Sequence, residues 1–133
     1  MRNQIRDLLA ADAALAGLLS GGIHIATEIN RQETPVAFDA NSEVLPCALV
    51  RQETTTPAGV HPEAARVFVR IFFYQQRGMD KIDAAMARCF ALLDRQRLDG
   101  CWEIQHADDL HDLHDPGLNC SLAMSRYLAV ARR

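Results

Sequence analysis

Imidazole and carboxylate side chains, the donors that could hold a metal ion, gather in one stretch of this 133-residue sequence, His106–Asp115. The stretch contains three histidines and four aspartates. Such donors suit zinc, manganese or non-haem iron, and His111 and His114 would converge if the stretch formed a helical turn. Metal sites usually take ligands from rigid elements, whereas this stretch leads into Pro116-Gly117 and is expected to be a loop. We therefore favour a solvated acidic loop, with a weak cation site between subunits as the alternative.

Other chemistry has little support in the sequence. It contains no nucleophile-elbow, P-loop, dinucleotide-binding or His-Glu-x-x-His motif, and none of its four serines has a base nearby. The cysteines lie far apart in apolar stretches and are Cys47, Cys89, Cys101 and Cys120. We expect buried free thiols in a reducing cytoplasm rather than disulfides or zinc ligands. The expectation is a protein that is not an enzyme and has no catalytic residue, bound metal or cofactor.

The clearest pattern is the alternation within Arg66–Tyr74. The apolar positions of one face are Val67, Val69, Ile71 and Phe73, which predicts a strand with that face buried. The opposite face carries Arg66, Phe68, Arg70, Phe72 and Tyr74. A mixture of arginines and aromatics is typical of a subunit interface, which we favour. The alternatives are a second core layer covered by Glu28–Asn41 and, least favoured, a nucleic-acid platform on which aromatics stack against bases.

Helical spacing and alternation predict the remaining elements. One helix is expected over Asn3–Leu19, and a second begins with Asp80 as its N-cap and has an apolar side made of Ile82, Met86, Cys89, Phe90 and Leu93. Strands are expected at Ile23–Ile25, at Leu45–Glu53, at Cys101–His106 with Trp102, Ile104 and His106 on one side, and at Cys120–Val130 with Cys120, Leu122, Met124, Leu128 and Val130 opposite Tyr127. This order predicts an α+β fold, a mainly antiparallel sheet of four to five strands with two helices packed on one face. Residues 1–133 are expected to form a single domain.

Two polar links separate the expected strands. The first, Thr54–Pro62, is longer than the 2 to about 5 residues of an ordinary hairpin connection, so it is either an interaction arm or a mobile loop. The second link, Ala107–Asn119, holds most of the histidine and aspartate cluster.

Neither the net charge nor the hydropathy of the sequence indicates a binding partner. The formal net charge is -3 and the isoelectric point is about 5.9, which gives no general attraction to nucleic acid or to an anionic membrane. No window approaches the roughly 20 apolar residues of a membrane span, and we expect a soluble protein made in the cytoplasm. Glu103–Asp115 holds five acids and no Lys or Arg, whereas the end of the chain is basic through Arg126, Arg132 and Arg133. A head-to-tail contact between copies is one use of that asymmetry.

The order of these elements resembles the tail terminator proteins of long-tailed bacteriophages, also called tail completion or minor tail proteins. The features that carry the resemblance are the Leu8–Leu15 helical pattern, the strand beginning at Pro46, the strand Val67–Tyr74, the helix Ile82–Leu93 and the last strand ending near Tyr127. The resemblance spans nearly the whole chain. It implies a tail-terminator-like subunit of a hexameric ring that caps the tail tube, stops tube polymerisation and provides the joining surface for the head.

The resemblance also implies a location, partners and contact residues. The ring would be assembled in the host cytoplasm and lie at the neck end of the virion tail, between the tail tube protein and the head-tail connector or neck protein, with no membrane involved. Contacts with the neighbouring subunit or the tube would use Arg66, Phe68, Arg70, Phe72 and Tyr74, together with Thr55, Thr56 and Val60. The acidic residues at the lumen or rim would be Asp108, Asp109, Asp112 and Asp115, and DNA would pass them without specific binding.

A hypothesis of a different class competes with this one. In it, the chain is a small cytoplasmic metal- or ligand-binding protein that uses the cluster His106–Asp115.

Overall fold

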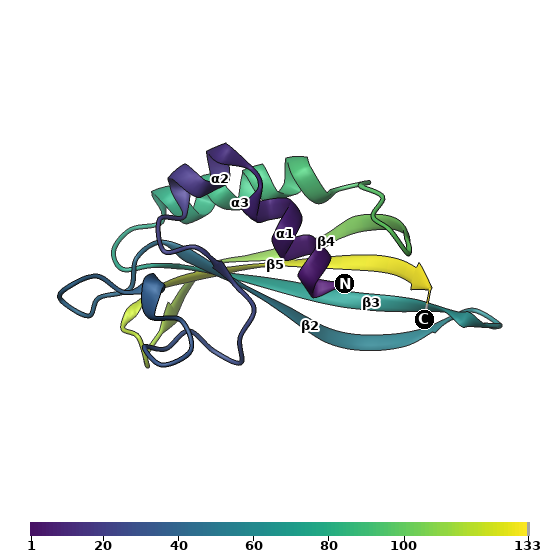
Figure 1. Ribbon diagram of the computed structural model, residues 1–133, viewed down its shortest axis with the longest axis horizontal. Coiled ribbons are helices and arrows are strands. Elements are labelled where there is room, and N and C mark those ends of the chain that lie inside the picture. Colours follow the sequence, from purple (N-terminus) through teal and green to yellow (C-terminus); the bar gives the residue numbers. More distant parts are fainter. Residues whose placement is uncertain (133) are drawn as a thin grey trace.

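The computed structural model describes residues 1–132, apart from the side chains of residues 61 and 62. Its elements are α1 (Arg2–Ala10), α2 (Ala13–Leu18), β1 (Ile23–His24), a 3-10 turn (Pro35–Ala37), β2 (Cys47–Ala58), β3 (His61–Gln75), α3 (Asp80–Leu93), β4 (Cys101–Asp115) and β5 (Cys120–Arg132). The strands form one sheet in the order β1-β2-β3-β5-β4, in which only the β1–β2 pair is parallel. All three helices lie on one face of this sheet (Figure 1). The predicted α+β class and its mainly antiparallel sheet are confirmed.

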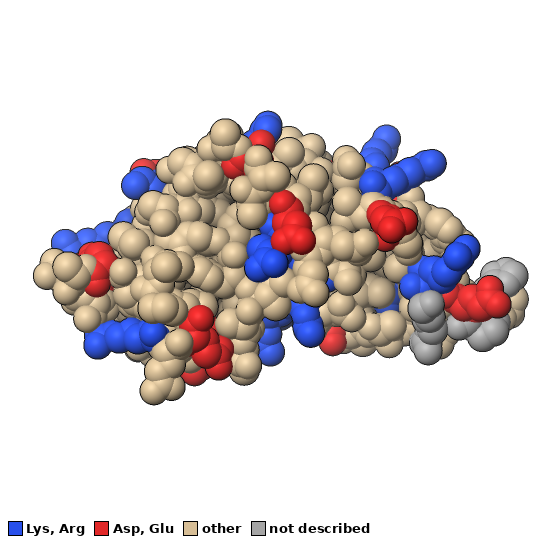
Figure 2. Space-filling model, viewed as in Figure 1, with Lys and Arg blue, Asp and Glu red and all other residues tan. Residues whose placement is uncertain are grey.

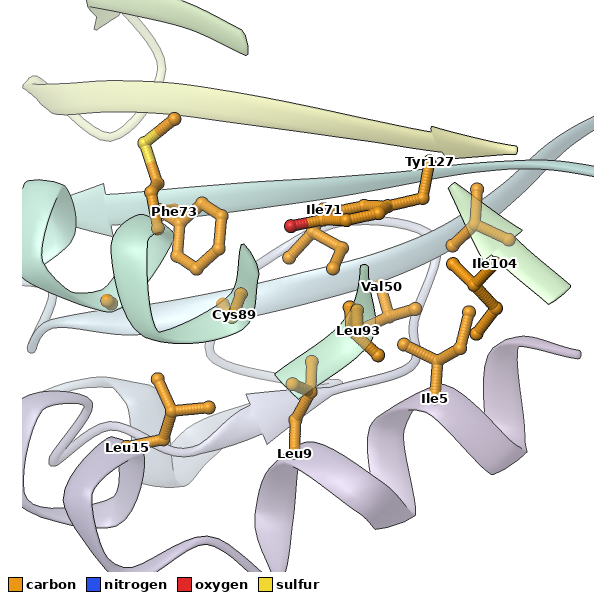
Figure 3. Packing of buried hydrophobic residues seen from close by; sticks show 14 of the residues in the cluster. Ile5, Leu9, Leu15, Val50, Ile71, Phe73, Cys89, Leu93, Ile104 and Tyr127 are labelled. Atoms are coloured by element: carbon orange, nitrogen blue, oxygen red, sulfur yellow. The ribbon is translucent and has the colours of Figure 1, made fainter. Parts of the chain in front are cut away.

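The central strand β3 places its apolar residues where the alternation predicts. Val67, Val69, Ile71 and Phe73 are at most 6% exposed and face the helix layer. From the helices, Ile5, Leu9, Leu15 and Leu93 point into the same cluster (Figure 3). Ile82 of α3 also belongs to it. Burying these side chains between helices and sheet supplies the main hydrophobic stabilisation of the fold.

The expected helix over Asn3–Leu19 is divided in two. α1 ends at Ala10, and Asp12 lies in an extended conformation as the N-cap of α2, where its carboxylate accepts the Leu15 N–H at 3.0 Å. The same carboxylate receives two hydrogen bonds from Arg88 of α3, at 2.7 and 3.0 Å. The break therefore caps the first turn of α2 with a residue type that is favoured there. The hydrogen bonds from Arg88, which tie α2 to α3, are not visible in the local sequence.

α3 begins one residue earlier than a cap at Asp80 would require, since Asp80 is its first helical residue. The side chain of Gln75 takes the capping role, because its Oε1 accepts the N–H groups of Lys81 and Ile82 at 3.0 and 3.2 Å. The expectation that Phe90 belongs to the apolar face is wrong. Phe90 follows Cys89 by one residue, is therefore rotated about 100° away, and is 46% exposed at the margin beside His106.

The link expected over Thr54–Pro62 is regular structure rather than a loop. β2 continues to Ala58 and pairs with β3 as a hairpin whose turn contains Gly59, at a φ of 67°. Thr55 lies opposite Val67 and Thr56 opposite Arg66, as suits β-branched side chains. We call this extension, residues 53–63, the arm; it projects beyond the helix layer (Figure 1).

The second link is also a strand for most of its length. β4 runs to Asp115 along the outer side of β5, and a turn at residues 116–119 joins the two. Three register shifts interrupt the pairing, and the first lies between Cys101 and Glu103. This shift removes Trp102 from the side expected for it, so that Ile104 is buried while Trp102 is 61% exposed.

β5 alternates as expected, and its inner face is the one that carries Tyr127. Ala123, Tyr127 and Ala129 are at most 1% exposed beneath the helices. The ring of Tyr127 reaches from β5 into the cluster, with its oxygen among carbon side chains (Figure 3). Within the described residues, this hydroxyl has no hydrogen-bond partner.

All four cysteines are free and buried, as expected. Burial raises the pKa of the Cys47, Cys89 and Cys120 thiols to about 12. At neutral pH these side chains are therefore neutral apolar groups of the core.

We expect Tyr127→Phe to increase the free energy of unfolding by about 1 kcal/mol, because it removes a buried hydroxyl that lacks a partner. Denaturant unfolding measures the change. Tyr127→Ala is the matched control and should lower the free energy of unfolding by about 3 to 5 kcal/mol through the cavity it leaves. A loss of stability in Tyr127→Phe would contradict the assignment of an unsatisfied hydroxyl.

The stabilising effect of Asp12 should depend on pH. Hydrogen bonds from Arg88 lower the pKa of Asp12 in the folded chain. A carboxyl group whose folded pKa is depressed stabilises the fold above its unfolded pKa, about 4, and loses that contribution as the pH falls through the folded value. The unfolding midpoint of Asp12→Asn should therefore lie below wild type at pH 6, and the difference should shrink below about pH 4. Asp7→Asn is the control, and a gap that stays constant with pH would contradict the assignment.

Candidate interaction surfaces

The face of the sheet opposite the helices is covered at one end and open at the other. Its residues on β3 are Arg66, Phe68, Arg70, Phe72 and Tyr74, flanked by Leu49, Arg51 and Glu53 of β2 and by Leu122, Met124, Arg126, Leu128 and Val130 of β5. We call the part from Phe72 to Arg66, with its neighbours on β2 and β5, the open face. On it Arg66 is exposed, and Phe68, Arg70 and Phe72 are half-buried.

Tyr74 does not belong to the open face. It is 7% exposed and packs in a second hydrophobic cluster with Ile29, Ala37 and Val44 from the segment that crosses beneath the sheet. Burial raises the pKa of its hydroxyl. The expected cover by Glu28–Asn41 is therefore present at the Tyr74 end only, and Phe72 lies at the boundary of the covered region.

Two of the arginines of the open face are neutralised within the chain. Arg70 contacts the Glu53 carboxylate with Nε at 2.6 Å and Nη2 at 2.9 Å. Arg126 donates to Asp108 at 2.8 Å, and its guanidinium lies 5.6 Å from the centroid of the Phe68 ring. Each guanidinium group thus has a carboxylate partner, and that of Arg126 also lies over an aromatic ring. The buried Nε atoms of both arginines nevertheless make no hydrogen bond with a described residue.

Arg51 and Arg66 differ from their neighbours. Among the described residues, no carboxylate lies within ion-pair distance of either guanidinium group. Arg51 stands beside Arg70 in the register of β2 and β3. It borders a hollow of about 290 Å³ whose other lining residues are Gln52, Glu53, Arg70 and Phe72. The open face thus offers a concave site that combines an available cation with an aromatic side chain.

The predicted contact residues of the arm are at the surface. Thr55 is exposed, Thr56 is half-buried and Val60, in the turn, is 91% exposed. An apolar side chain at the tip of a projecting hairpin has no partner within its own subunit to bury it, which suits a contact with another molecule.

The four aspartates of the acidic stretch have different surroundings. Asp108 pairs with Arg126, and Asp115 accepts the Leu118 N–H at 3.0 Å. Asp112 is exposed and forms no ion pair with a described residue. The expected charge asymmetry is thus partly cancelled within the chain by Arg126; Arg132 is exposed, and Arg133 lies outside the described residues.

Asp109 accepts hydrogen bonds from Ser125 at 2.6 Å and His106 at 2.8 Å. Partial burial acts to raise the pKa of Asp109, but the hydrogen bonds from these two side chains outweigh it and hold that pKa below its usual value. The carboxylate bridges serine and histidine, so the histidine does not face the serine as a base would.

The histidines of the stretch do not converge. They lie on an extended strand instead of a helical turn, which corrects the premise for a site made by His111 and His114. His106 packs edge-on against Phe90 and Tyr127, with ring centroids 5.3 Å apart in both cases. His111 lies 3.7 Å from Asp83 of α3. Among the side chains that the structure describes, no three His, Cys, Asp or Glu residues form a group that could hold a metal ion.

Charged side chains of both signs are scattered over the face seen in Figure 2, and neither sign forms a broad stripe there. On the open face itself, Arg70 is paired with Glu53 and Arg126 with Asp108. This pairing does not favour the nucleic-acid interpretation of the Arg66–Tyr74 face, which requires a track of available positive charge for phosphates. None of the helices described is both long and apolar enough to cross a membrane.

Several members of the open face were not predicted. Arg51 and Glu53 alternate with Leu49 along β2, a signal that was present in the sequence. Arg126 interrupts the apolar face expected for β5 and also belongs to the basic end of the chain, and neither pattern predicts its pairing with Asp108. The sequence alone does not show the register of the strands, which places these residues beside Arg70.

Comparison with known proteins identifies a fold. The structure is similar to a chain in the virion of a native gene transfer agent particle, with a TM-score of 0.73 and 15% sequence identity. The likeness covers 100% of this chain and 95% of that chain. No protein-family model matches the sequence, and no match was found among curated proteins. At this level of identity the likeness concerns the fold.

We expect divalent zinc or manganese to leave the melting temperature of the purified protein unchanged, because the described histidines and carboxylates do not converge. Calorimetric titration of the metal-free protein should show no saturable 1:1 binding. His111→Ala with His114→Ala is the matched variant and should behave as wild type. Stoichiometric binding that this variant loses would contradict the expectation and favour the metal-binding hypothesis.

Proposed function

We propose that this chain is a structural virion protein, and specifically a phage-type tail terminator subunit with no enzymatic activity. The observation that carries the proposal is the full-length fold likeness to a chain of a gene transfer agent virion. The resemblance of the element order to tail terminators supports the finer assignment. The metal-binding form of the competing hypothesis lacks geometric support among the described residues.

In this proposal the subunit forms a closed ring, six-membered as the resemblance implies, at the neck end of a tail after assembly in the host cytoplasm. One surface of the ring matches the last ring of the tail tube, and the other does not accept further tube protein but receives the head-tail connector. The mechanism is geometric, since contacts between unlike surfaces of identical subunits close into a ring when the rotation permits.

The open face and the arm are the surfaces that suit these contacts. Phe68, Arg70 and Phe72 provide aromatic and guanidinium groups, which are enriched in the buried centres of protein interfaces. Val60 supplies an apolar contact at the tip of the arm. Internal pairing of Arg70 with Glu53 lets that cation be covered by a neighbour without being left unpaired.

The acidic strand suits a position at the lumen or its rim. Asp108, Asp109, Asp112 and Asp115 are spaced along β4, the outermost strand of the sheet. Negative charge there would repel the DNA backbone and allow DNA to pass without binding.

The decisive experiment measures the mass and shape of the purified protein over a range of concentrations, with and without a divalent cation. Light scattering gives the mass, and electron microscopy shows whether closed rings with an open centre form. We expect rings from wild type and a folded subunit without rings from Arg70→Glu combined with Phe72→Ser, since this variant removes the charge and aromatic surface of the open face.

Lys81→Glu with Phe90→Ser is the matched control, because it makes the same kinds of change on exposed positions of α3. It should assemble as wild type. Rings that persist in the Arg70 and Phe72 variant would exclude the open face as the interface. A wild-type chain that never assembles under any of these conditions would count against the ring-forming function itself.

A further inference from the structure

We infer that the open face receives a defined partner, a bulge on β4 of a second copy of this chain. The bulge comprises residues 110–113, and it would enter the hollow bordered by Arg51 and Phe72. The inference rests on the proposed function, because it specifies how neighbouring subunits of the ring would meet.

The bulge is a protruding surface with apolar flanks. The pairing of β4 with β5 shifts between Leu110 and Leu113, and Asp112 adopts a left-handed conformation with a φ of 55°. Leu110 is 50% exposed and Leu113 is 37% exposed. Two large apolar side chains on either side of an exposed carboxylate are costly to leave in water and typical of a surface that another molecule covers.

The hollow has the complementary properties. Arg51 has no carboxylate partner among the described residues, and Phe72 is half-buried at the boundary of the second hydrophobic cluster. Glu53 is present in the hollow but is occupied by Arg70. A carboxylate flanked by leucines would therefore meet an available guanidinium group and an aromatic ring.

The two surfaces cannot meet within one subunit. Arg51 lies on β2, where β1 covers only the neighbouring Ala48 and Leu49, and the bulge lies on β4 at the opposite edge of the sheet. A contact between them must join one subunit's β2 edge to the next subunit's β4 edge. Such a contact is heterologous. A growing chain of subunits always has one free hollow and one free bulge at its ends, and these two meet only when the ring is complete.

Asp112 thereby leaves the group of aspartates assigned to the lumen. Of the other three, Asp108 and Asp109 are already held by Arg126, His106 and Ser125 within their own subunit. Asp115 accepts the Leu118 N–H. Asp112 has no ion-pair partner among the described residues and is therefore the carboxylate available for another copy.

Charge reversal tests the contact. Arg51→Glu and Asp112→Arg are each expected to weaken self-association by about 30-fold or more, because each creates a like-charge pair at every interface. An equimolar mixture of the two variants should form rings of wild-type mass. When the two variants alternate around the ring, two kinds of interface form. One pairs Glu at position 51 with Arg at position 112, and the other pairs the native Arg51 with the native Asp112.

Matched controls are Arg97→Glu and Asp99→Arg, both at exposed positions between α3 and β4. They should assemble alone, and circular dichroism should show all four variants folded. Rings formed normally by either single variant at the contact, or no rings from the mixture, would overturn this inference while the proposed function stands. A wild-type protein that stays monomeric under every condition would overturn both.

Discussion

The fold depends on a single constraint, the two unlike faces of β3. This strand pairs along most of its length with β2 on one side and β5 on the other, so its inward residues must be apolar and its outward residues need some other cover. The helices meet the first requirement through Ile5, Leu9 and Leu93. The segment around Ile29 and Ala37 meets the second only near Tyr74. The open face exists because this covering segment ends before it reaches Phe68.

The charged side chains of the open face are described better by the ion pairs that they form than by their net charge. Glu53 and Asp108 each take one arginine, and the Arg126 guanidinium also lies over Phe68. A surface arranged in this way can be removed from water at lower cost than one with isolated charges, because each ion keeps its partner. The same arrangement explains why a net charge of -3 says little about what the surface binds.

The sequence predicted those elements whose pattern is imposed by burial on one side. The alternation of Val67 to Phe73 and the spacing of Ile82, Cys89 and Leu93 gave the central strand and its covering helix. Such patterns did not predict the arm or the outer half of β4, because a strand exposed on both faces shows no alternation of apolar and polar residues. The contact of Asp12 with Arg88 joins residues 76 positions apart, so it could not be predicted from the local sequence. The candidate residues on β3 follow from their alternate positions in the sequence. Arg51 and the ion pairs could be placed beside them only from the register in which the strands pair.

The position of β5 has a consequence for the order in which the molecule forms. β3 acquires its second neighbour only from residues 120–132, after α3 and β4 have been made, and Ala64 finally pairs with Arg132. During synthesis the apolar edge of β3 therefore remains open while nearly half of the chain is still to emerge. Pairings of such long range form slowly and leave intermediates prone to aggregation. The edge strand β4 is joined to the sheet only through β5. The assembly proposed above would therefore begin only after the sheet of each subunit has closed.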